Sequence, residues 1–167
     1  MQPGHSGQIV KPDYLELFRA LGRAGVDYIV VGGVAAILEG APITTLDLDI
    51  VCRRDDDNLG RLTELLDDLE ARYRDPAGRV IRPTPDRPAS NKINLLETSL
   101  GPLDVMQSVG PDWDWADLVS RSRILEVGSL DLRVLKLASV IESKELADRE
   151  KDRAMLPVLR RTLEEKG

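Results

Sequence analysis

The sequence has very little histidine and cysteine, two residue types on which many enzyme sites depend. It contains one histidine, His5, and one cysteine, Cys52. Because His5 lies in a Gly/Ser/Pro-containing N-terminal tail, there is almost no material for triads that use histidine as the base or for zinc sites rich in histidine. A single cysteine excludes a disulfide within the chain. Any catalysis must therefore rest on carboxylates, and the chain has 29 Asp and Glu residues against 23 Lys and Arg.

Aromatic residues and long apolar runs are also scarce. Aromatics make up 4% of a chain that is 42% hydrophobic, so the core must consist mainly of aliphatic side chains. Such a core favours helices packed on a sheet over an aromatic-rich β-sandwich. No apolar run reaches transmembrane length and no signal peptide is recognisable, so we expect a cytoplasmic protein with no membrane partner. The net charge of -6 argues against broad non-specific binding to nucleic acid.

The order of patterned segments predicts an α/β fold, α+β in stricter usage, with a small mixed sheet, helices on one side and a C-terminal helical pair. Helices are expected at 12–24, 34–38, 55–73, 113–120, 134–147 and 149–163. Strands are expected at 28–31, 46–51, 92–98, 103–109, 124–127 and 130–132, with a hairpin turn at 99–102 and a loop at 75–91. We divide the chain into a flexible tail (1–11), a core (12–132) and a C-terminal helical segment (133–167) that closes a cleft.

Asp47 and Asp49 lie two residues apart in an alternating run that predicts a strand with one apolar and one polar face. Residues so spaced are separated by about 6.6 Å along the chain and point the same way. Their carboxylates can converge on one or two divalent cations, and hard oxygen ligands select Mg²⁺ or Mn²⁺ over zinc. The plainer interpretation is the solvated face of an edge strand, and a bare Asp-x-Asp favours that one.

A glycine pair, Gly32-Gly33, follows the apolar run at 28–31 and opens the helix expected at 34–38. At such a junction, free backbone amides and the positive end of the helix dipole can hold the outer phosphates of a nucleotide. Glycine also lets a phosphate approach the backbone closely. Because Gly-Gly after a strand is more often only a turn, its weight depends on the aspartates that follow.

Together these segments resemble the signature of the polymerase-β-like nucleotidyltransferase superfamily. In that superfamily a glycine turn, here Val31-Gly32-Gly33, precedes an Asp-x-Asp strand, here Asp47-Leu48-Asp49, at about this spacing. More narrowly, the sequence looks like the minimal nucleotidyltransferases related to toxins of type IV toxin-antitoxin systems. Two positions depart from their pattern, since Ile43 stands where arginine is expected and Gly33 stands where many relatives have serine.

The resemblance implies a nucleotidyltransferase core at 12–132 and a set of site residues. Asp104 matches the third carboxylate of the superfamily, which serves as metal ligand or general base, so the implied catalytic and metal-binding residues are Asp47, Asp49 and Asp104. The implied nucleotide-binding residues are Gly32, Gly33, Thr45, Lys136 and Lys144. The alternatives are a strand-start aspartate that satisfies a turn and ordinary solvated lysines on the C-terminal helices.

The implied reaction is Mg²⁺-dependent transfer of a nucleoside monophosphate from a nucleoside triphosphate to a hydroxyl, with release of pyrophosphate. The acceptor stays open between RNA, a protein hydroxyl and a small molecule such as an aminoglycoside. An antitoxin or a second copy of the chain would be a partner that completes the site.

Two other hypotheses stand beside the enzyme. One is a degenerate module that holds a nucleotide or a protein without turnover, motivated by Ile43. The other is an interaction domain with an acidic strand face.

Overall fold

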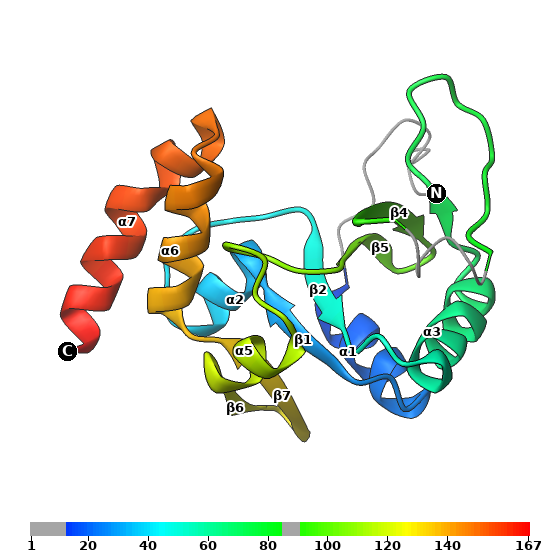
Figure 1. The fold of residues 1–167 in the computed structure, drawn as a ribbon, viewed down its shortest axis with the longest axis horizontal. Helices are drawn as coiled ribbons and strands as arrows, with labels where there is room; N and C mark the ends of the chain where they lie inside the picture. Colours follow the sequence, from blue (N-terminus) through cyan, green and yellow to red (C-terminus); the bar gives the residue numbers. More distant parts are fainter. Residues whose placement is uncertain (1–12, 85–90) are drawn as a thin grey trace, which may run out of the picture.

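The computed structural model describes residues 13–84 and 91–167, so the expected tail, with His5, and part of the expected loop at 75–91 lie outside the described residues. In the described part of the chain, seven strands form one sheet in the order β3-β4-β5-β2-β1-β7-β6 (Figure 1). The pairs β2–β5 and β1–β7 are parallel and the others antiparallel, which makes the sheet mixed. The strands are β1 (Tyr28–Val31), β2 (Leu48–Cys52), β3 (Arg72–Tyr73), β4 (Ile93–Thr98), β5 (Gly101–Met106), β6 (Ser122–Val127) and β7 (Leu130–Leu135).

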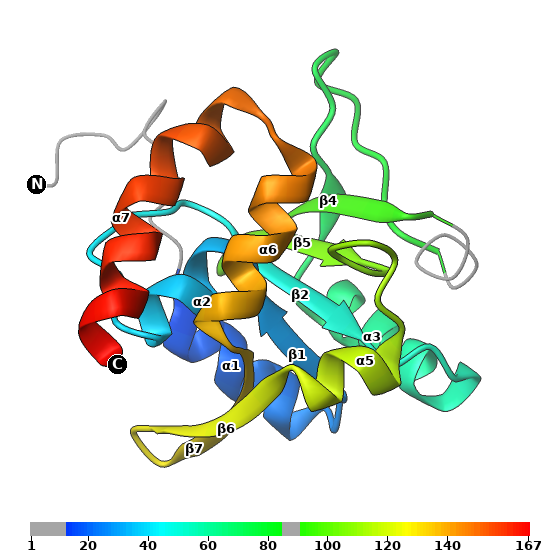
Figure 2. The same cartoon turned by 60° about the vertical axis from the view of Figure 1, so that its left-hand side comes forward.

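Helices pack around this sheet, and the C-terminal pair α6 and α7 crosses it on the side away from α1 and α3 (Figure 2). The helices are α1 (Tyr14–Arg23), α2 (Gly32–Leu38), α3 (Asp56–Asp68), α5 (Trp115–Ser120), α6 (Leu137–Ala147) and α7 (Glu150–Lys166). Among the helices that the structure describes, none is both long and apolar enough to cross a membrane. The mixed sheet with its helices and C-terminal helical pair confirms the predicted fold class.

Strand β2 has the two faces that its sequence predicts. Leu48 and Ile50 are fully buried, whereas Asp49 lies on the opposite face and is only partly buried. Helix α1 covers the apolar face of the sheet, where the Phe18 and Tyr28 rings stack with centroids 6.5 Å apart. Burial of each leucine or isoleucine contributes roughly 1.5–3 kcal/mol. This face therefore fixes the register of β2, since a slip of one residue would turn Asp49 into the core.

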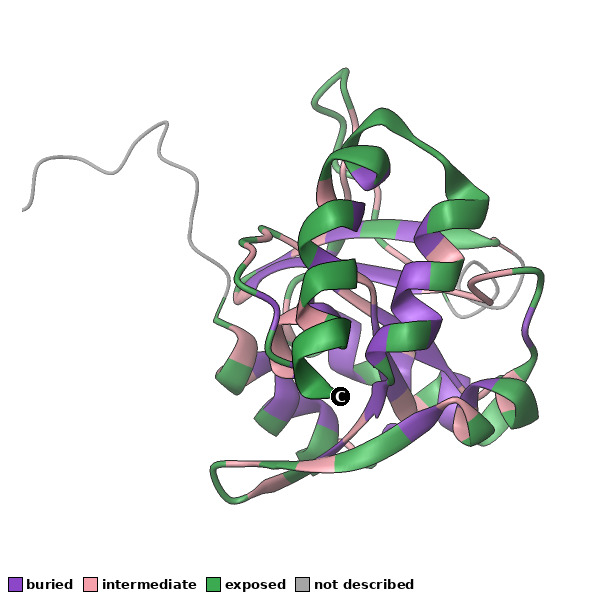
Figure 3. Ribbon diagram, turned by 90° about the vertical axis from the view of Figure 1, so that its left-hand side faces the viewer, coloured by how far each residue is buried: buried purple, intermediate pink, exposed green. Residues whose placement is uncertain are grey.

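The burial pattern distinguishes the two C-terminal helices (Figure 3). Helix α6 buries Leu137, Val140 and Ile141, whereas α7 is mostly exposed and buries Leu156 and Leu159. The polar face of the sheet thus has a buried helix above it, and α7 packs outside that helix.

Helix α3 is shorter than predicted. It ends at Asp68, whereas the prediction extended it to Tyr73. Glu70 adopts a left-handed φ of 53°, which an α-helix cannot continue through. Arg72 and Tyr73 then pair with β4 as the edge strand β3. This correction matters because the next residue, Arg74, reaches the site described below.

The C-terminal helical segment also begins later than predicted. Val134 pairs with Val30 in the parallel ladder and with Arg123 in the antiparallel one, so the chain stays extended through Leu135. Helix α6 starts only after Lys136, which is its N-cap residue. Two ladders of hydrogen bonds outweigh the helical spacing that the sequence shows there.

The predicted hairpin at 92–109 forms with a tighter turn. Strands β4 and β5 pair from Ile93 opposite Met106 to Thr98 opposite Gly101. The turn predicted at 99–102 is therefore two residues long, and β5 starts earlier. Asp104 consequently lies in the middle of β5.

Candidate active site

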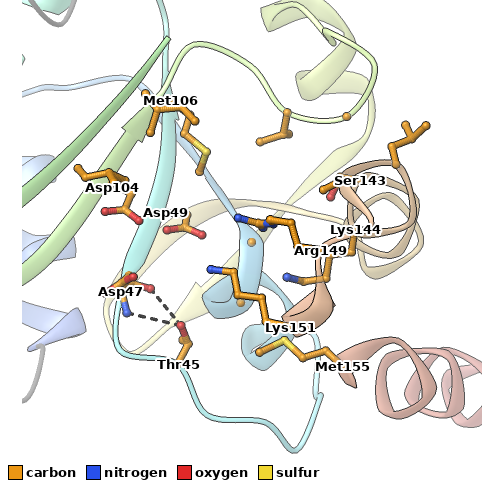
Figure 4. A pocket seen from close by; sticks show the side chains of 18 residues that line it. Thr45, Asp47, Asp49, Asp104, Met106, Ser143, Lys144, Arg149, Lys151 and Met155 are labelled. Atoms are coloured by element: carbon orange, nitrogen blue, oxygen red, sulfur yellow. Dashed lines mark hydrogen bonds between the residues drawn. The ribbon is translucent and has the colours of Figure 1, made fainter. Parts of the chain in front are cut away.

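The three predicted carboxylates meet on the polar face of the sheet. Strands β2 and β5 pair in parallel with Asp49 directly opposite Asp104. Directly paired residues present their side chains on the same face, so these two carboxylates are neighbours. Asp47 lies just before β2, two positions from Asp49, and Figure 4 shows all three side chains turned to the same space.

These carboxylates form one wall of a pocket of about 470 Å³, within the size range of small-molecule sites. The glycine turn and Thr45 border them at one end, while Ile93, Leu95 and Met106 add an apolar patch on β4 and β5. The facing wall comes from α6, α7 and the turn between them (Figure 4). The pocket therefore joins residues from both halves of the chain.

The backbone of the glycine turn lies against the carboxylates. Gly32 has a φ of 66°, and a Cβ added there would lie 2.3 Å from Oδ2 of Asp49. A Cβ added to Gly33 would meet the Thr45 side chain at 3.1–3.3 Å. The hydroxyl of Thr45 in turn lies 3.5 Å from both the amide nitrogen and the carbonyl oxygen of Asp47. At position 32, therefore, only glycine leaves the Asp49 carboxylate where it lies.

The two glycines are expected to respond differently to alanine. Gly32→Ala should cost about 1–2 kcal/mol for the left-handed backbone and push the Asp49 carboxylate aside, so that stabilisation by Mg²⁺ and a triphosphate is lost. Gly33→Ala needs only a small shift of Thr45 and should cost less than about 1 kcal/mol. Thermal melts of both variants, with and without ligands, measure this difference. Equal ligand-induced increases in melting temperature in both variants would contradict the conclusion that Gly32 keeps the Asp49 carboxylate in position.

Cationic side chains on the opposite wall face the carboxylates. Lys144, Arg149 and Lys151 line the pocket across from Asp49 (Figure 4). Fully buried Asp152 holds two of them, since it accepts a hydrogen bond from Lys144 Nζ at 3.3 Å and another from Arg149 Nε at 2.7 Å. Burial raises the pKa of Asp152, but the hydrogen bond from Arg149 and the charge of Lys144 outweigh it, so the pKa lies below its ordinary value. Asp152 therefore stays ionised and fixes both cations at the pocket.

Crowding of negative charge alters the proton affinity of the carboxylates. Burial, then the charge of Asp104 and hydrogen bonding with it, then the charge of Asp47 raise the pKa of Asp49 to about 7, while Lys144 opposes the shift. Burial also raises the pKa of Asp104, although Arg74 opposes it. Without a bound cation, the site is thus short of positive charge around Asp49.

In the absence of divalent cations, Asp49 should make the protein less stable as the pH rises from about 4 to about 7. Its folded pKa of about 7 exceeds the ordinary aspartate pKa of 3.8, so the folded chain binds more protons over this interval. The contribution is fully present below the unfolded pKa and is lost as the pH rises through the folded pKa, with a slope of at most about 1.4 kcal/mol per pH unit.

Urea unfolding in EDTA across this range, for wild type and Asp49→Asn, isolates the contribution of Asp49. The comparison is needed because Asp152 acts in the opposite direction: its lowered pKa gives stability that is lost on acidification. Parallel stability curves for the two proteins would show that Asp49 is not perturbed in this way.

An arginine that the sequence did not single out also reaches the carboxylates. Arg74 Nη2 donates to Oδ1 of Asp104, and its Nη1 lies 3.6 Å from Oδ1 of Asp47. The side chain of Arg74 is 28% exposed and that of Asp104 is 12% exposed, so water screens this pair only partly. Asp47 and Asp104 are thereby partly neutralised, whereas Asp49 is not paired with Arg74.

The donor set suits a hard divalent cation, although the carboxylates do not form a finished ligand cluster. Carboxylate oxygens are the ligands that Mg²⁺ and Mn²⁺ prefer, and no described residue of the pocket wall is histidine or cysteine. Within 13–84 and 91–167, however, no group of three or more His, Cys, Asp or Glu side chains is arranged to hold a metal ion. The residues present fit the cation by chemistry, and Arg74 is paired with two of the three carboxylates, those of Asp47 and Asp104.

The structure does not bring every predicted residue to the pocket. Gly32, Gly33, Thr45 and Lys144 line it with the three aspartates, whereas Lys136 is not among the lining residues and caps α6. Ile43, at the position where arginine is expected, packs against the hydrophobic core.

Searches by sequence and by structure gave different results. A scan against protein-family models found no match to this chain, and a search of curated proteins found none. Solved structures do match. A protein of Thermotoga maritima, described as a nucleotidyltransferase, is 16% identical, with a TM-score of 0.52 over 97% of this chain and 99% of that one.

Two further proteins of known structure match this chain. The antibiotic-resistance factor ANT(2″)-Ia, in complex with adenylyl-2″-tobramycin, is 14% identical, with a TM-score of 0.57 over 90% of this chain and 87% of that one. An antigenic nucleotidyltransferase-like protein of Paracoccidioides brasiliensis is 19% identical, with a TM-score of 0.51 over 86% and 72% of the two chains. Identities this low establish the fold alone, and this chain shares the fold of these three proteins.

Proposed function

We propose that this protein transfers a nucleoside monophosphate from a nucleoside triphosphate to an acceptor hydroxyl. The observation that carries the proposal is the pairing of Asp49 with Asp104 across parallel strands, beside a glycine turn and opposite a wall of cations. This arrangement occurs in a chain with a nucleotidyltransferase fold. The relation to toxin-antitoxin systems rests on the sequence resemblance alone.

The pocket has separate groups for phosphate and for a cation. The backbone at Gly32-Gly33, which lines the pocket, and the side chains of Lys144, Arg149 and Lys151 would bind the phosphates, because amides and cations form strong hydrogen bonds to anionic oxygens. Asp47, Asp49 and Asp104 would hold Mg²⁺ or Mn²⁺, which supplies neutralisation of phosphate charge when bound.

Asp104 is suited to accept the proton of the acceptor. In the transfer, the acceptor oxygen forms a bond to the α-phosphorus, and the bond from that phosphorus to the bridging oxygen breaks. Pyrophosphate leaves with the electron pair, and the hydroxyl proton passes to a carboxylate oxygen of Asp104. Burial raises the pKa of Asp104, which makes it a stronger base than a solvated aspartate.

The acceptor belongs to one of three classes: RNA, a protein hydroxyl or a small molecule. The adenylylated tobramycin bound to ANT(2″)-Ia is an example of the third class in a protein of this fold. An antitoxin or a second copy of the chain would be the partner that completes the acceptor side.

Labelled triphosphates test the proposal directly. The protein is incubated with each of the four labelled triphosphates, Mg²⁺ and a cell lysate, and release of pyrophosphate and transfer of label to RNA, protein or metabolites are measured. Binding of each triphosphate to the protein alone is measured with and without Mg²⁺. Transfer that requires Mg²⁺ and is lost in Asp104→Asn supports the enzyme. Mg²⁺-dependent binding without transfer would instead identify a non-catalytic module, and no binding would identify an interaction domain.

A further inference from the structure

We propose that Arg74 is an exchangeable counterion of this site, which holds Asp47 and Asp104 until a divalent cation and a triphosphate displace it together. The inference rests on the proposed function, because it assumes that these carboxylates bind a cation. It goes further by assigning a binding order and a residue that sets it.

The backbone of Arg74 is held by the sheet, whereas its guanidinium group can move. Its backbone N–H donates to the carbonyl of Leu95 at 3.0 Å, which anchors the residue to β4 directly after β3. From there the guanidinium spans to Asp104 and Asp47, and one further contact, of 3.4 Å, joins Nη1 to the carbonyl of Leu96. The side chain is 28% exposed, so a path toward solvent is open without movement of the sheet.

The guanidinium and a divalent cation compete for the same atoms. Arg74 uses Oδ1 of Asp104 and lies near Oδ1 of Asp47. A Mg²⁺ ion binds such oxygens at about 2.0–2.1 Å and demands near-octahedral geometry, which leaves no room for a guanidinium on those oxygens. A cation therefore has to displace Arg74 before all three carboxylates can coordinate that cation.

Displacement leaves a positive guanidinium close to a divalent cation, and this repulsion opposes binding of the metal alone. A triphosphate removes the repulsion, because its oxygens accept the planar fork of an arginine. Metal and triphosphate should consequently bind together more tightly than the product of their separate affinities predicts. The coupling is reciprocal, so each ligand should raise the affinity for the other by the same factor.

The test measures Mn²⁺ binding without nucleotide, by electron paramagnetic resonance and calorimetry. Arg74→Gln removes the competing charge and should bind Mn²⁺ alone about 10–100-fold more tightly than wild type, the factor expected for loss of a charge-assisted hydrogen bond. Arg72→Gln is the matched control, since Arg72 is exposed on the edge strand β3, directly before Tyr73 and Arg74, and its substitution makes the same change in net charge. Its Mn²⁺ affinity should equal that of wild type.

A second measurement uses a non-hydrolysable triphosphate analogue. In wild type, saturating analogue should strengthen Mn²⁺ binding by a large factor, and in Arg74→Gln that factor should shrink by about tenfold or more. A merely structural role of Arg74 would lower the melting temperature of the variant without raising its Mn²⁺ affinity. If Arg74→Gln does not fold, Arg74→Met supplies the same comparison, because methionine keeps a long unbranched side chain and removes the charge.

The outcomes separate this proposal from the function on which it rests. Mn²⁺ binding that is measurable and equal in wild type and both Arg74 variants would overturn the role of Arg74 and leave the proposed function standing. No Mn²⁺ binding by any variant, with or without the analogue, would overturn both.

Discussion

Asp49→Asn is expected to leave the metal-free protein at least as stable as wild type, and to abolish both ligand-induced stabilisation and transfer. Burial and, after it, the neighbouring carboxylates raise the pKa of Asp49 to about 7, so its ionised form is destabilised near neutral pH. Asparagine keeps the shape and removes the charge, which relieves repulsion in the metal-free fold. The same change removes a hard anionic ligand, so Mg²⁺ and triphosphate should no longer raise the melting temperature.

Thermal melts with and without Mg²⁺ and triphosphate measure this effect, together with release of pyrophosphate. Asp67→Asn, an exposed aspartate on α3, is the control and should change stability by no more than about 0.5 kcal/mol. A ligand-induced shift that survives in Asp49→Asn would remove Asp49 from the site.

Asp152→Asn should cause the largest loss of stability among the substitutions considered. Asp152 is fully buried and paired with both Lys144 and Arg149. Removing one partner of a buried ion pair costs about 3–5 kcal/mol, a large share of the roughly 5–15 kcal/mol that stabilises a domain. The cations would also lose the carboxylate that positions them at the pocket, so triphosphate affinity should fall in whatever fraction still folds.

Urea unfolding and triphosphate titration test this expectation. The control is Asp148→Asn at the end of α6, where the carboxylate pairs with Arg153 in an exposed position. Asparagine tolerates the left-handed backbone of that residue, so this change should stay within about 0.5 kcal/mol. Similar losses in both variants would show that burial of Asp152 is not what makes it important.

The sequence predicted best what lies within one short stretch. The glycine turn begins α2, between β1 and β2, and the pair Asp47 and Asp49 follows at a spacing that can be read directly. The structure places these residues at one pocket. Asp104 comes from a separate hairpin. The alternating pattern around Asp104 predicts which face of its strand the side chain lies on. Only the family resemblance predicts that Asp104 lies beside Asp49, because local periodicity does not determine which strands pair.

The parts that were missed depend on contacts between distant segments. The spacing of apolar residues predicts that α3 continues past Glu70, because the left-handed backbone of Glu70 leaves no trace in that pattern. The edge strand β3, which positions Arg74, was therefore not predicted. Arg149 acts at the pocket because Asp152 holds it there, and a sequence with many paired charges gives no sign of which pair is buried. Lys136 was placed on a helix face because the apolar run before it does not mark where strand ends and helix begins.

The parallel pairing of β2 with β5 has a consequence for how the protein opens. Asp49 and Asp104 become neighbours only when a connection that includes α3 and the β3–β4 pair has folded back to the sheet. No partly open form that separates β2 from β5 can keep the two carboxylates together, so ligand binding belongs to the fully assembled sheet. Bound metal and triphosphate should therefore slow amide hydrogen exchange in the central strands β2 and β5. The amides of the β6–β7 hairpin, at the edge of the sheet, should continue to exchange through local opening.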